Sequence, residues 1–254
     1  MDLGLHDRVV LITGAGGGAG PTIARAFAGE GAVVALHHRG GSGSAVRAEA
    51  TAAEIVAAGG RAMAVAADLG SSSQIEAMFT RVAADLGPVT VLVTATSAYR
   101  SERFAEIADD SWAAVVDDML GATFRTCRVA VPGMQAAGWG RIVNIAARSG
   151  LVGVARATHY AAAKAGIVGL TASLAKELGP SGILVNAVAP TQILTIKKRM
   201  PSIADERTAK LARKIPLRRL ATPDDLAALV VWLGSGANTY VTGETISLTG
   251  GDQR

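Results

Sequence analysis

Short runs rich in β-branched residues alternate with alanine-rich stretches along almost the whole chain. Most of these runs are apolar throughout, as expected for strands of a parallel sheet that helices cover on both faces. The alternation therefore predicts an α/β fold with a doubly wound parallel sheet and helices on both of its faces. The runs lie at 8–14, 32–38, 61–68, 90–96, 141–147, 182–190 and 245–251.

The length and composition fit one folded unit. The chain has 254 residues, 50% of them hydrophobic, and it carries no repeat or low-complexity linker that would divide it. We therefore expect a single domain over 1–254. Five glycines stand between an alanine-rich stretch and the next apolar run, and each is predicted to end a helix. These are Gly31, Gly59, Gly87, Gly140 and Gly182.

Charge and cysteine content argue against several classes of protein. The net charge of +4 comes without a dense basic block, which disfavours nucleic-acid binding. The single cysteine, Cys127, excludes an internal disulfide and suits a reducing compartment. No apolar run reaches the roughly 18 residues of a membrane span, and no secretory leader is recognisable. We expect a soluble cytoplasmic protein with no membrane partner and no metal site.

A glycine-rich segment follows the first apolar run. Residues 13–20 precede Pro21 and an amphipathic stretch. Glycines let a backbone approach a pyrophosphate closely, and the free amides of a helix N-terminus attract its charge. Between a strand and a helix, the segment indicates a dinucleotide site in a Rossmann-type fold, although a flexible turn would use similar residues. The candidate contacts are Thr13, Gly14, Gly16, Gly17, Gly18 and Gly20.

The end of the second apolar run bears on the choice of nicotinamide cofactor. An acid there would bind a free ribose 2′-hydroxyl, whereas a base suits a 2′-phosphate. His37, His38 and Arg39 stand at this position. Because a guanidinium donates charge-assisted hydrogen bonds to phosphate, we predict NADP, with His38 and Arg39 in its site, over NAD. In the alternative interpretation Arg39 only caps a surface turn.

The alternation is interrupted at 191–216. This segment contains Lys197, Lys198, Arg199 and Pro201, and it follows a predicted strand end, where α/β sheets bind ligands. We predict that 191–216 is a substrate lid, with a solvated basic loop as the alternative.

Several motifs in order make the chain resemble a short-chain dehydrogenase/reductase, of the branch similar to ketoacyl reductases. They span almost the whole chain: Thr13-Gly14-x-x-x-Gly18-x-Gly20, Asp68-Leu69, Tyr160-x-x-x-Lys164, Val185-Asn186-Ala187-Val188-Ala189-Pro190, and Thr242-Gly243-Glu244 followed by Gly250-Gly251. The resemblance implies an oxidoreductase that is a homodimer or homotetramer, built on the helices that hold Phe124 and Tyr160. The cofactor contacts that it implies are Asp68 and Leu69 beside the adenine, Ile193 and Thr195 over the nicotinamide, and Ala95, Tyr160, Lys164 and Pro190.

Tyr160 and Lys164 are the predicted catalytic residues. A spacing of four places them on one face of a helix, and an ammonium beside a phenol is expected to lower the phenol's pKa from about 10. Such a tyrosine can exchange a proton with a substrate. Taken alone, the pair would more often be ordinary surface packing of a lysine stem along a ring.

The chain departs from the family pattern at positions that line the same cleft. Ala147 stands where the family has a catalytic serine, and Met119 where it has a catalytic asparagine. The segment from Thr94 to Ser97 replaces the usual Asn-Asn-Ala-Gly, and Thr191 replaces a glycine. Thr96 or Ser97 could supply a hydroxyl from the neighbouring strand end. Ser149, if the segment were extended, would point to the opposite face.

Three functions are consistent with these residues. The first is an NADP(H)-dependent oxidoreductase that transfers hydride to a carbonyl, quinone or activated enone-like substrate, with Tyr160 as the proton donor. Losing one polarising donor typically costs about 10² to 10³ in turnover, so ordinary ketones should react poorly. The second is a catalytically silent, cofactor-binding subunit that pairs with an active relative. The third is a redox-neutral isomerase or cyclase on the same fold.

Overall fold

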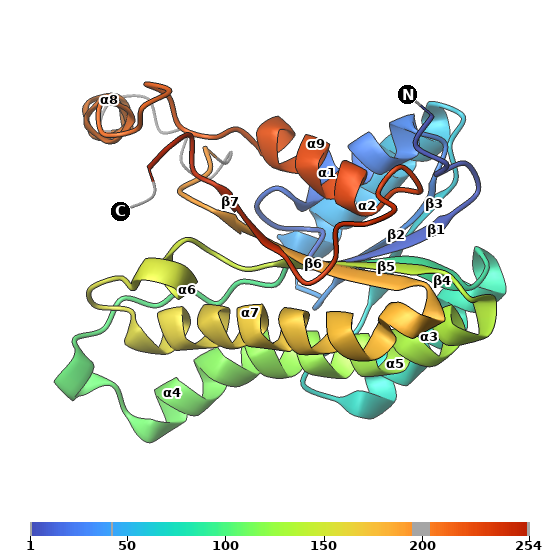
Figure 1. Ribbon diagram of the computed structural model, residues 1–254, viewed down its shortest axis with the longest axis horizontal. Helices are drawn as coiled ribbons and strands as arrows, with labels where there is room; N and C mark the ends of the chain where they lie inside the picture. The colour runs from blue at the N-terminus through green and yellow to red at the C-terminus, as the bar shows by residue number, and fades with distance from the viewer. Residues whose placement is uncertain (1, 42, 195–203, 253–254) are drawn as a thin grey trace.

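The computed structural model describes residues 2–41, 43–194 and 204–252. Within them, seven parallel strands form one sheet in the order β3-β2-β1-β4-β5-β6-β7 (Figure 1). The order reverses between β1 and β4, which is the switch point where sheets of this kind bind ligands. The strands are β1 (Val9–Thr13), β2 (Val33–His38), β3 (Ala62–Ala66), β4 (Val89–Thr94), β5 (Gly140–Ile145), β6 (Ile183–Pro190) and β7 (Thr245–Leu248).

Helices cover both faces of the sheet, as the sequence predicts (Figure 1). One face carries α1 (Gly20–Gly29), α2 (Ser44–Ala57) and α9 (Pro223–Leu233). The other carries α3 (Ser72–Asp85), α4 (Asp109–Val116), α5 (Ala122–Ala137) and α7 (Thr158–Leu178). The short α6 (Ser149–Val152) packs against α7, and α8 (Ala204–Ala212) lies apart from the sheet. The described residues also form two 3₁₀ turns, η1 (Phe104–Glu106) and η3 (Gly179–Ser181).

Alternate side chains of the strands enter two separate cores. In β1, Val10 and Ile12 pack in the core that also holds Phe27 of α1. Val9 and Leu11 pack in the opposite core. Because successive strand residues point to opposite faces, a strand that is buried on both faces must be apolar throughout.

The prediction that five glycines end helices is confirmed for four of them. Gly31, Gly59, Gly87 and Gly182 have positive φ, which favours glycine. The prediction is wrong for Gly140, which begins β5. Gly138, with φ +62°, ends α5 instead. A Cβ at Gly140 would lie 2.7 Å from the Met134 sulfur, so close packing accounts for that glycine.

The helical stretch from Asp109 to Ala137 is interrupted. α4 and α5 are joined by η2 (Asp117–Gly121), a five-residue π-helical turn. Such turns insert an extra residue into a helix and often lie at functional sites. Met119, at the position of the family's catalytic asparagine, is in this turn and is fully buried. No helix in the described part of the chain is long and apolar enough to cross a membrane.

Candidate cofactor and active site

The glycine-rich segment joins β1 to α1 at the switch point of the sheet. The Ala95 amide donates to both the carbonyl oxygen (3.2 Å) and Oγ1 (3.1 Å) of Thr13, which ties the ends of β1 and β4 together. Gly14 has φ +66°, and a Cβ there would lie 2.9 Å from the Ala95 carbonyl oxygen. The structure therefore brings together Thr13, Gly14 and Ala95, three of the residues predicted to contact the cofactor.

The rest of the segment approaches other backbone closely. A Cβ at Gly16 would collide with the Ser44 carbonyl, and one at Gly20 would collide with the Ala15 carbonyl. Gly17 accepts the amide of Gly20 at 2.9 Å, and Gly18 has φ +52° with open space on its Cβ side. These contacts keep the backbone bare of side chains where the segment enters α1.

The N-terminus of α1 carries an unneutralised partial positive charge. Its N-cap residue, Ala19, makes no side-chain cap, its first turn contains no acid, and Pro21 lies at its start. The positive end of the helix dipole is therefore left for an anion. This end of α1 fits a pyrophosphate.

The side chain of His37 anchors the glycine segment by a hydrogen bond, a role that was not predicted from the sequence. Its Nδ1 accepts the Gly14 amide at 3.0 Å, and its Nε2 lies 3.0 Å from the Ala67 carbonyl oxygen. The first contact requires a bare Nδ1, so Nε2 carries the proton and donates. Burial is the main reason that the pKa of His37 falls from 6.5 to about 4, so the imidazole is neutral. No local spacing signals this contact, because Gly14 is 23 residues away.

Arg39 and His38 follow at the end of β2. The Nη2 of Arg39 donates to Oδ1 of Asp118 in η2 at 2.5 Å, and this hydrogen bond is the main reason that the pKa of Arg39 is raised. The side chain of Arg39 remains 57% exposed. His38 is buried, and its Nδ1 accepts the Gly40 amide at 3.1 Å. The sequence predicts the position of Arg39 but not its acidic partner, which lies 79 residues away.

Asp68 and Leu69 form the turn that follows β3. The Asp68 carboxylate accepts the Gly70 amide at 2.9 Å, while Leu69 is buried and its carbonyl accepts Nε of Arg125 at 2.7 Å. Arg125 in turn pairs with both carboxylate oxygens of Asp117 at 2.9 Å. The turn is therefore anchored to the start of α5.

Lys164 of α7 is buried and points toward the strand ends. Its Nζ donates to the carbonyl oxygens of Ile145 (2.6 Å) and Thr96 (3.2 Å). Burial lowers its pKa from 10.5 to about 8. Thr96 directly follows Ala95, which binds Thr13, so the glycine segment and the Tyr160–Lys164 helix meet on one short stretch of chain.

Tyr160 lies in α7, and its ring meets the ring of Tyr99 edge to face, with 5.2 Å between the centroids. The predicted lowering of its pKa is wrong. Burial raises the pKa of Tyr160 above 10, and a hydrogen bond from the Ser97 side chain opposes that rise only in part. The expectation failed because Lys164 directs its ammonium at two carbonyl oxygens instead. Ser97 is the candidate hydroxyl that the structure brings to Tyr160.

The two positions of lost family residues are apolar and buried. Met119 is 0% exposed in a cluster with Ala163 and Tyr160, and Ala147 is 8% exposed. The segment is not extended at Ser149, because the chain turns at Arg148 and Ser149 begins α6. The hydroxyl of Thr94, in the segment that departs from the family pattern, donates a hydrogen bond to the buried Asn144 amide oxygen at 2.8 Å.

The remaining predicted contacts lie at the end of β6 and after it. The Pro190 carbonyl accepts the Arg148 amide at 2.9 Å, the Thr191 amide donates to the Leu248 carbonyl at 3.0 Å, and Ile193 pairs with Ala221. Thr195 lies outside the described residues, as do 195–203 of the predicted lid.

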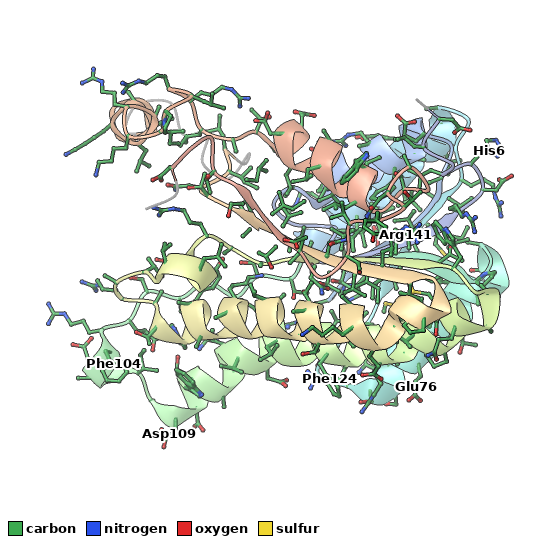
Figure 2. All side chains as sticks on the ribbon, in the orientation of Figure 1. His6, Glu76, Phe104, Asp109, Phe124 and Arg141 are labelled. Atoms are coloured by element: carbon green, nitrogen blue, oxygen red, sulfur yellow. The ribbon has the colours of Figure 1, made fainter. Side chains whose placement is uncertain are left out.

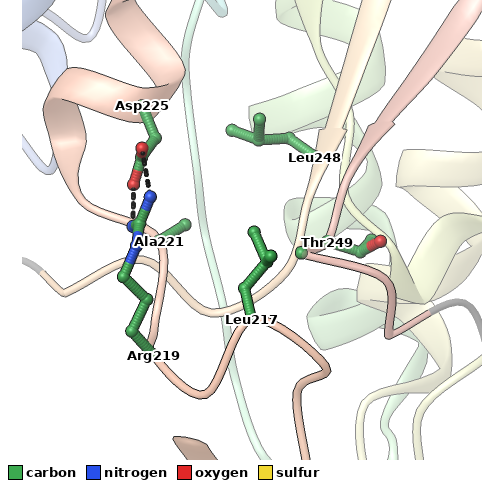
Figure 3. Close-up of a pocket in the computed structure, with 7 residues that line it drawn as sticks. Leu217, Arg219, Ala221, Asp225, Leu248 and Thr249 are labelled. Atoms are coloured by element: carbon green, nitrogen blue, oxygen red, sulfur yellow. Dashed lines mark hydrogen bonds and ion pairs between the residues drawn. The ribbon is translucent and has the colours of Figure 1, made fainter.

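A small pocket adjoins the end of the predicted lid (Figure 3). Its wall includes Leu217 and Leu248, and the paired side chains of Arg219 and Asp225 close one side. No group of three or more potential metal ligands occurs among the described residues.

Comparisons with known proteins cover almost the entire chain. A family model described as "Enoyl-(Acyl carrier protein) reductase" matches residues 14–252. The chain is 36% identical to 3-oxoacyl-[acyl-carrier-protein] reductase FabG of Pseudomonas aeruginosa over 98% of each chain. It is 34% identical to Nodulation protein G of Azospirillum brasilense over 97% of this chain and 98% of the relative. A solved structure from Sinorhizobium meliloti 1021, provisionally named a short-chain alcohol dehydrogenase, superposes with a TM-score of 0.90 at 30% identity and covers 99% of this chain and 98% of its own.

Proposed function

Because this chain belongs to the short-chain dehydrogenase/reductase family of oxidoreductases, we propose that it is an NADP(H)-dependent reductase of an activated electrophile. The electrophile is a carbonyl, a quinone or an enone-like compound that needs little polarisation. Residues 1–254 act as a single domain in this proposal, and Tyr160 and Lys164 are its catalytic residues.

The cofactor fit rests on the backbone around α1. The glycines of the segment leave its backbone bare at five positions, and the first turn of α1 has neither a side-chain cap nor an acid. Both features favour a pyrophosphate, and Arg39 at the end of β2 favours an added 2′-phosphate. When bound, a reduced nicotinamide supplies the hydride that the electrophilic carbon of the substrate accepts.

The partly buried position of Tyr160, with Ser97 at its hydroxyl and the Tyr99 ring against its own, is the observation that supports the proposed direction of reaction. Burial raises the pKa of its phenol above 10, so Oη holds its proton at neutral pH. A reduction needs an acid for the oxygen that gains charge, whereas an oxidation needs a base. A protonated Tyr160 with Ser97 at its hydroxyl supports reduction.

Lys164 connects two backbone segments of the proposed site. Its Nζ links the end of β5 to the segment after β4 through two carbonyl oxygens, at 2.6 and 3.2 Å. The ammonium therefore orients the backbone between the glycine segment and Tyr160. Burial lowers its pKa to about 8, so the side chain is mostly an ammonium at neutral pH and would be available to bind the ribose.

The surroundings of Tyr160 support an apolar substrate that is already activated. Ala147 and Met119 offer no donor to polarise a carbonyl oxygen, so the substrate must be reactive without one. Exposed apolar side chains nearby in the fold include Tyr99 next to Tyr160, and Leu151 and Val152 of α6, which packs on α7.

The test is turnover of NADPH with a panel of quinones, enones and diketones. We expect the best substrates to be oxidants that need little polarisation, with a loss of at least about tenfold in Tyr160→Phe. Turnover that is no greater than that of Tyr160→Phe for every substrate would overturn the proposal. Conversion of a substrate without loss of NADPH would favour an isomerase or cyclase.

The buried Met119 and Ala147 favour a second candidate, a cofactor-binding subunit without activity of its own. Such a subunit would bind NADPH, turn over no substrate, and purify from its native host with a related chain. Isolation of a homo-oligomer that consists of this chain alone would remove that candidate.

Other predictions stay proposals. The segment 191–216 is proposed as the substrate lid, supported by the contact of Leu194 with Ala221 at one end and by α8 within it. A homodimer or homotetramer is proposed on the helices that hold Phe124 and Tyr160, and a cytoplasmic location is proposed as well.

A further inference from the structure

An ion pair crosses the switch point of the sheet. Arg39 directly follows β2, and Asp118 belongs to η2, which leads into α5 beside β4. The strand order places β1 and the glycine segment between β2 and β4. The 2.5 Å contact between Arg39 and Asp118 therefore joins elements on the two sides of the switch point.

Asp118 is held in this pairing by the π-helical turn. Its neighbour Asp117 pairs with Arg125 through two hydrogen bonds of 2.9 Å, and Arg125 also holds the Leu69 carbonyl. The two consecutive acids of η2 thus engage arginines from different elements. Asp117 anchors the turn after β3 through Arg125, and Asp118 pairs with Arg39 at the end of β2.

Arg39 is consequently not a free cation. Asp118 accepts a hydrogen bond from its guanidinium, and the carboxylate of Asp68 is close enough to act on its charge. A 2′-phosphate that binds Arg39 must share the guanidinium with Asp118 or displace it, and it brings its own negative charge toward both carboxylates. A cofactor with a free 2′-hydroxyl brings no such charge.

We propose that Asp118 limits the preference of this chain for NADPH over NADH, because its carboxylate competes with the 2′-phosphate for Arg39. Asp118 is a positioning residue here, since it acts on the cofactor through Arg39. This inference rests on the proposed dinucleotide site. It predicts that the chain binds both nicotinamide cofactors, with a small advantage for NADPH.

Binding titrations with NADPH and NADH, followed by nicotinamide fluorescence, test the inference without any substrate. Asp118→Asn should tighten NADPH binding by about threefold to tenfold and change NADH binding by less than about twofold. The gain should vanish in an Arg39→Gln background, and Asp118→Glu should behave like the wild type. Asp117→Asn is the matched control, and it should not change the ratio of the two affinities.

Two results would overturn the inference. An unchanged NADPH affinity in Asp118→Asn would show that the carboxylate does not compete. Equal weakening of both cofactors would show that Asp118 has only a structural role, and thermal unfolding of the variant would reveal the same defect. If the wild type binds neither dinucleotide, the proposed function fails together with the inference. If it binds NADPH and only the variant fails to respond, the inference alone fails.

Discussion

At the scale of single residues, His37 links three parts of the site with one neutral imidazole. Its ring accepts from Gly14 and donates to Ala67, and burial lowers its pKa to about 4. An unfolded chain would bind a proton at this residue near pH 6.5. The native state therefore takes up that proton only at lower pH, and protonation opposes folding.

His37 should make the protein less stable as the pH falls. Its contribution is fully present above pH 6.5, decreases below it, and has been lost by about pH 4, a total on the order of 3 kcal/mol. Chemical denaturation at pH 7 and pH 5 measures the slope. His37→Asn keeps an acceptor for Gly14 but does not titrate, so its stability should change less over this range. Equal slopes in the two proteins would contradict the assignment.

Ala147 offers a gain-of-function test of the site. Ala147→Ser restores a hydroxyl where family members carry one, and it should raise ketone reduction by about tenfold to a hundredfold. The measurement is kcat/KM with an unactivated ketone and NADPH. Ala146→Ser, one position earlier, is the control. No rise in Ala147→Ser would mean that the cleft is remodelled beyond this residue.

The residues that the sequence predicts best are those fixed by strand ends and helical spacing. Thr13 and Ala95 meet because the carboxyl ends of parallel strands share one edge, and Tyr160 and Lys164 share one helix. The direction of the Lys164 ammonium was missed, because the carbonyl groups that it binds come from other elements. Polar contacts over long sequence distance carry no local pattern.

At the scale of elements, the strands follow the predicted runs closely, since apolar runs on a doubly covered sheet have few alternatives. The interruption between α4 and α5 could not be predicted, because a π-helical turn keeps the same apolar spacing to within one residue. The misplaced stop at Gly140 has a similar cause. Gly138 lies two residues before Gly140, the first residue of β5; Gly138 has positive φ and ends α5, whereas Gly140 packs closely against Met134.

The N-terminus of α9 has the strongest cap among the described helices of known cap geometry. Thr222 and Asp225 bind each other's backbone amides, and Arg219 binds both carboxylate oxygens of Asp225 (Figure 3). Asp225→Asn should lower the free energy of unfolding by about 1 to 2 kcal/mol, as judged by urea denaturation. Asp224→Asn, in the same turn, should cost less. Equal losses would contradict a specific role of the cap.

These contacts hold the pKa of Asp225 well below its usual value, with the Arg219 hydrogen bond as the largest cause. The sign of the pH effect follows. Asp225 contributes its stabilisation above the unfolded-state pKa near 3.9, and this contribution declines as the pH falls below that value.

At the scale of the whole molecule, the helix layer of α4 and α5 exposes aromatic side chains. Trp112 is 42% exposed and Phe124 46%, and Figure 2 shows Phe124 on the side of this layer away from the sheet. Exposed aromatic rings on a helix layer are typical of an interface between copies.

Phe124→Asp should therefore shift the protein from the proposed dimer or tetramer to a smaller species, because it would put a charge into the proposed interface. Light scattering after size-exclusion chromatography gives the mass. Val46→Asp, on the exposed side of α2 in the opposite layer, should leave the mass unchanged. An unchanged mass for Phe124→Asp would place any interface elsewhere.

The central claim is that the crevice between the glycine segment and Tyr160 binds a nicotinamide dinucleotide. Titration of the purified chain with NADPH, read by nicotinamide fluorescence with Arg39→Asp alongside, tests it most directly. We predict saturable binding by the wild type and a loss of at least about tenfold in the variant, since a phosphate partner becomes a carboxylate. Absence of NADPH and NADH binding in a folded wild-type protein would contradict the account.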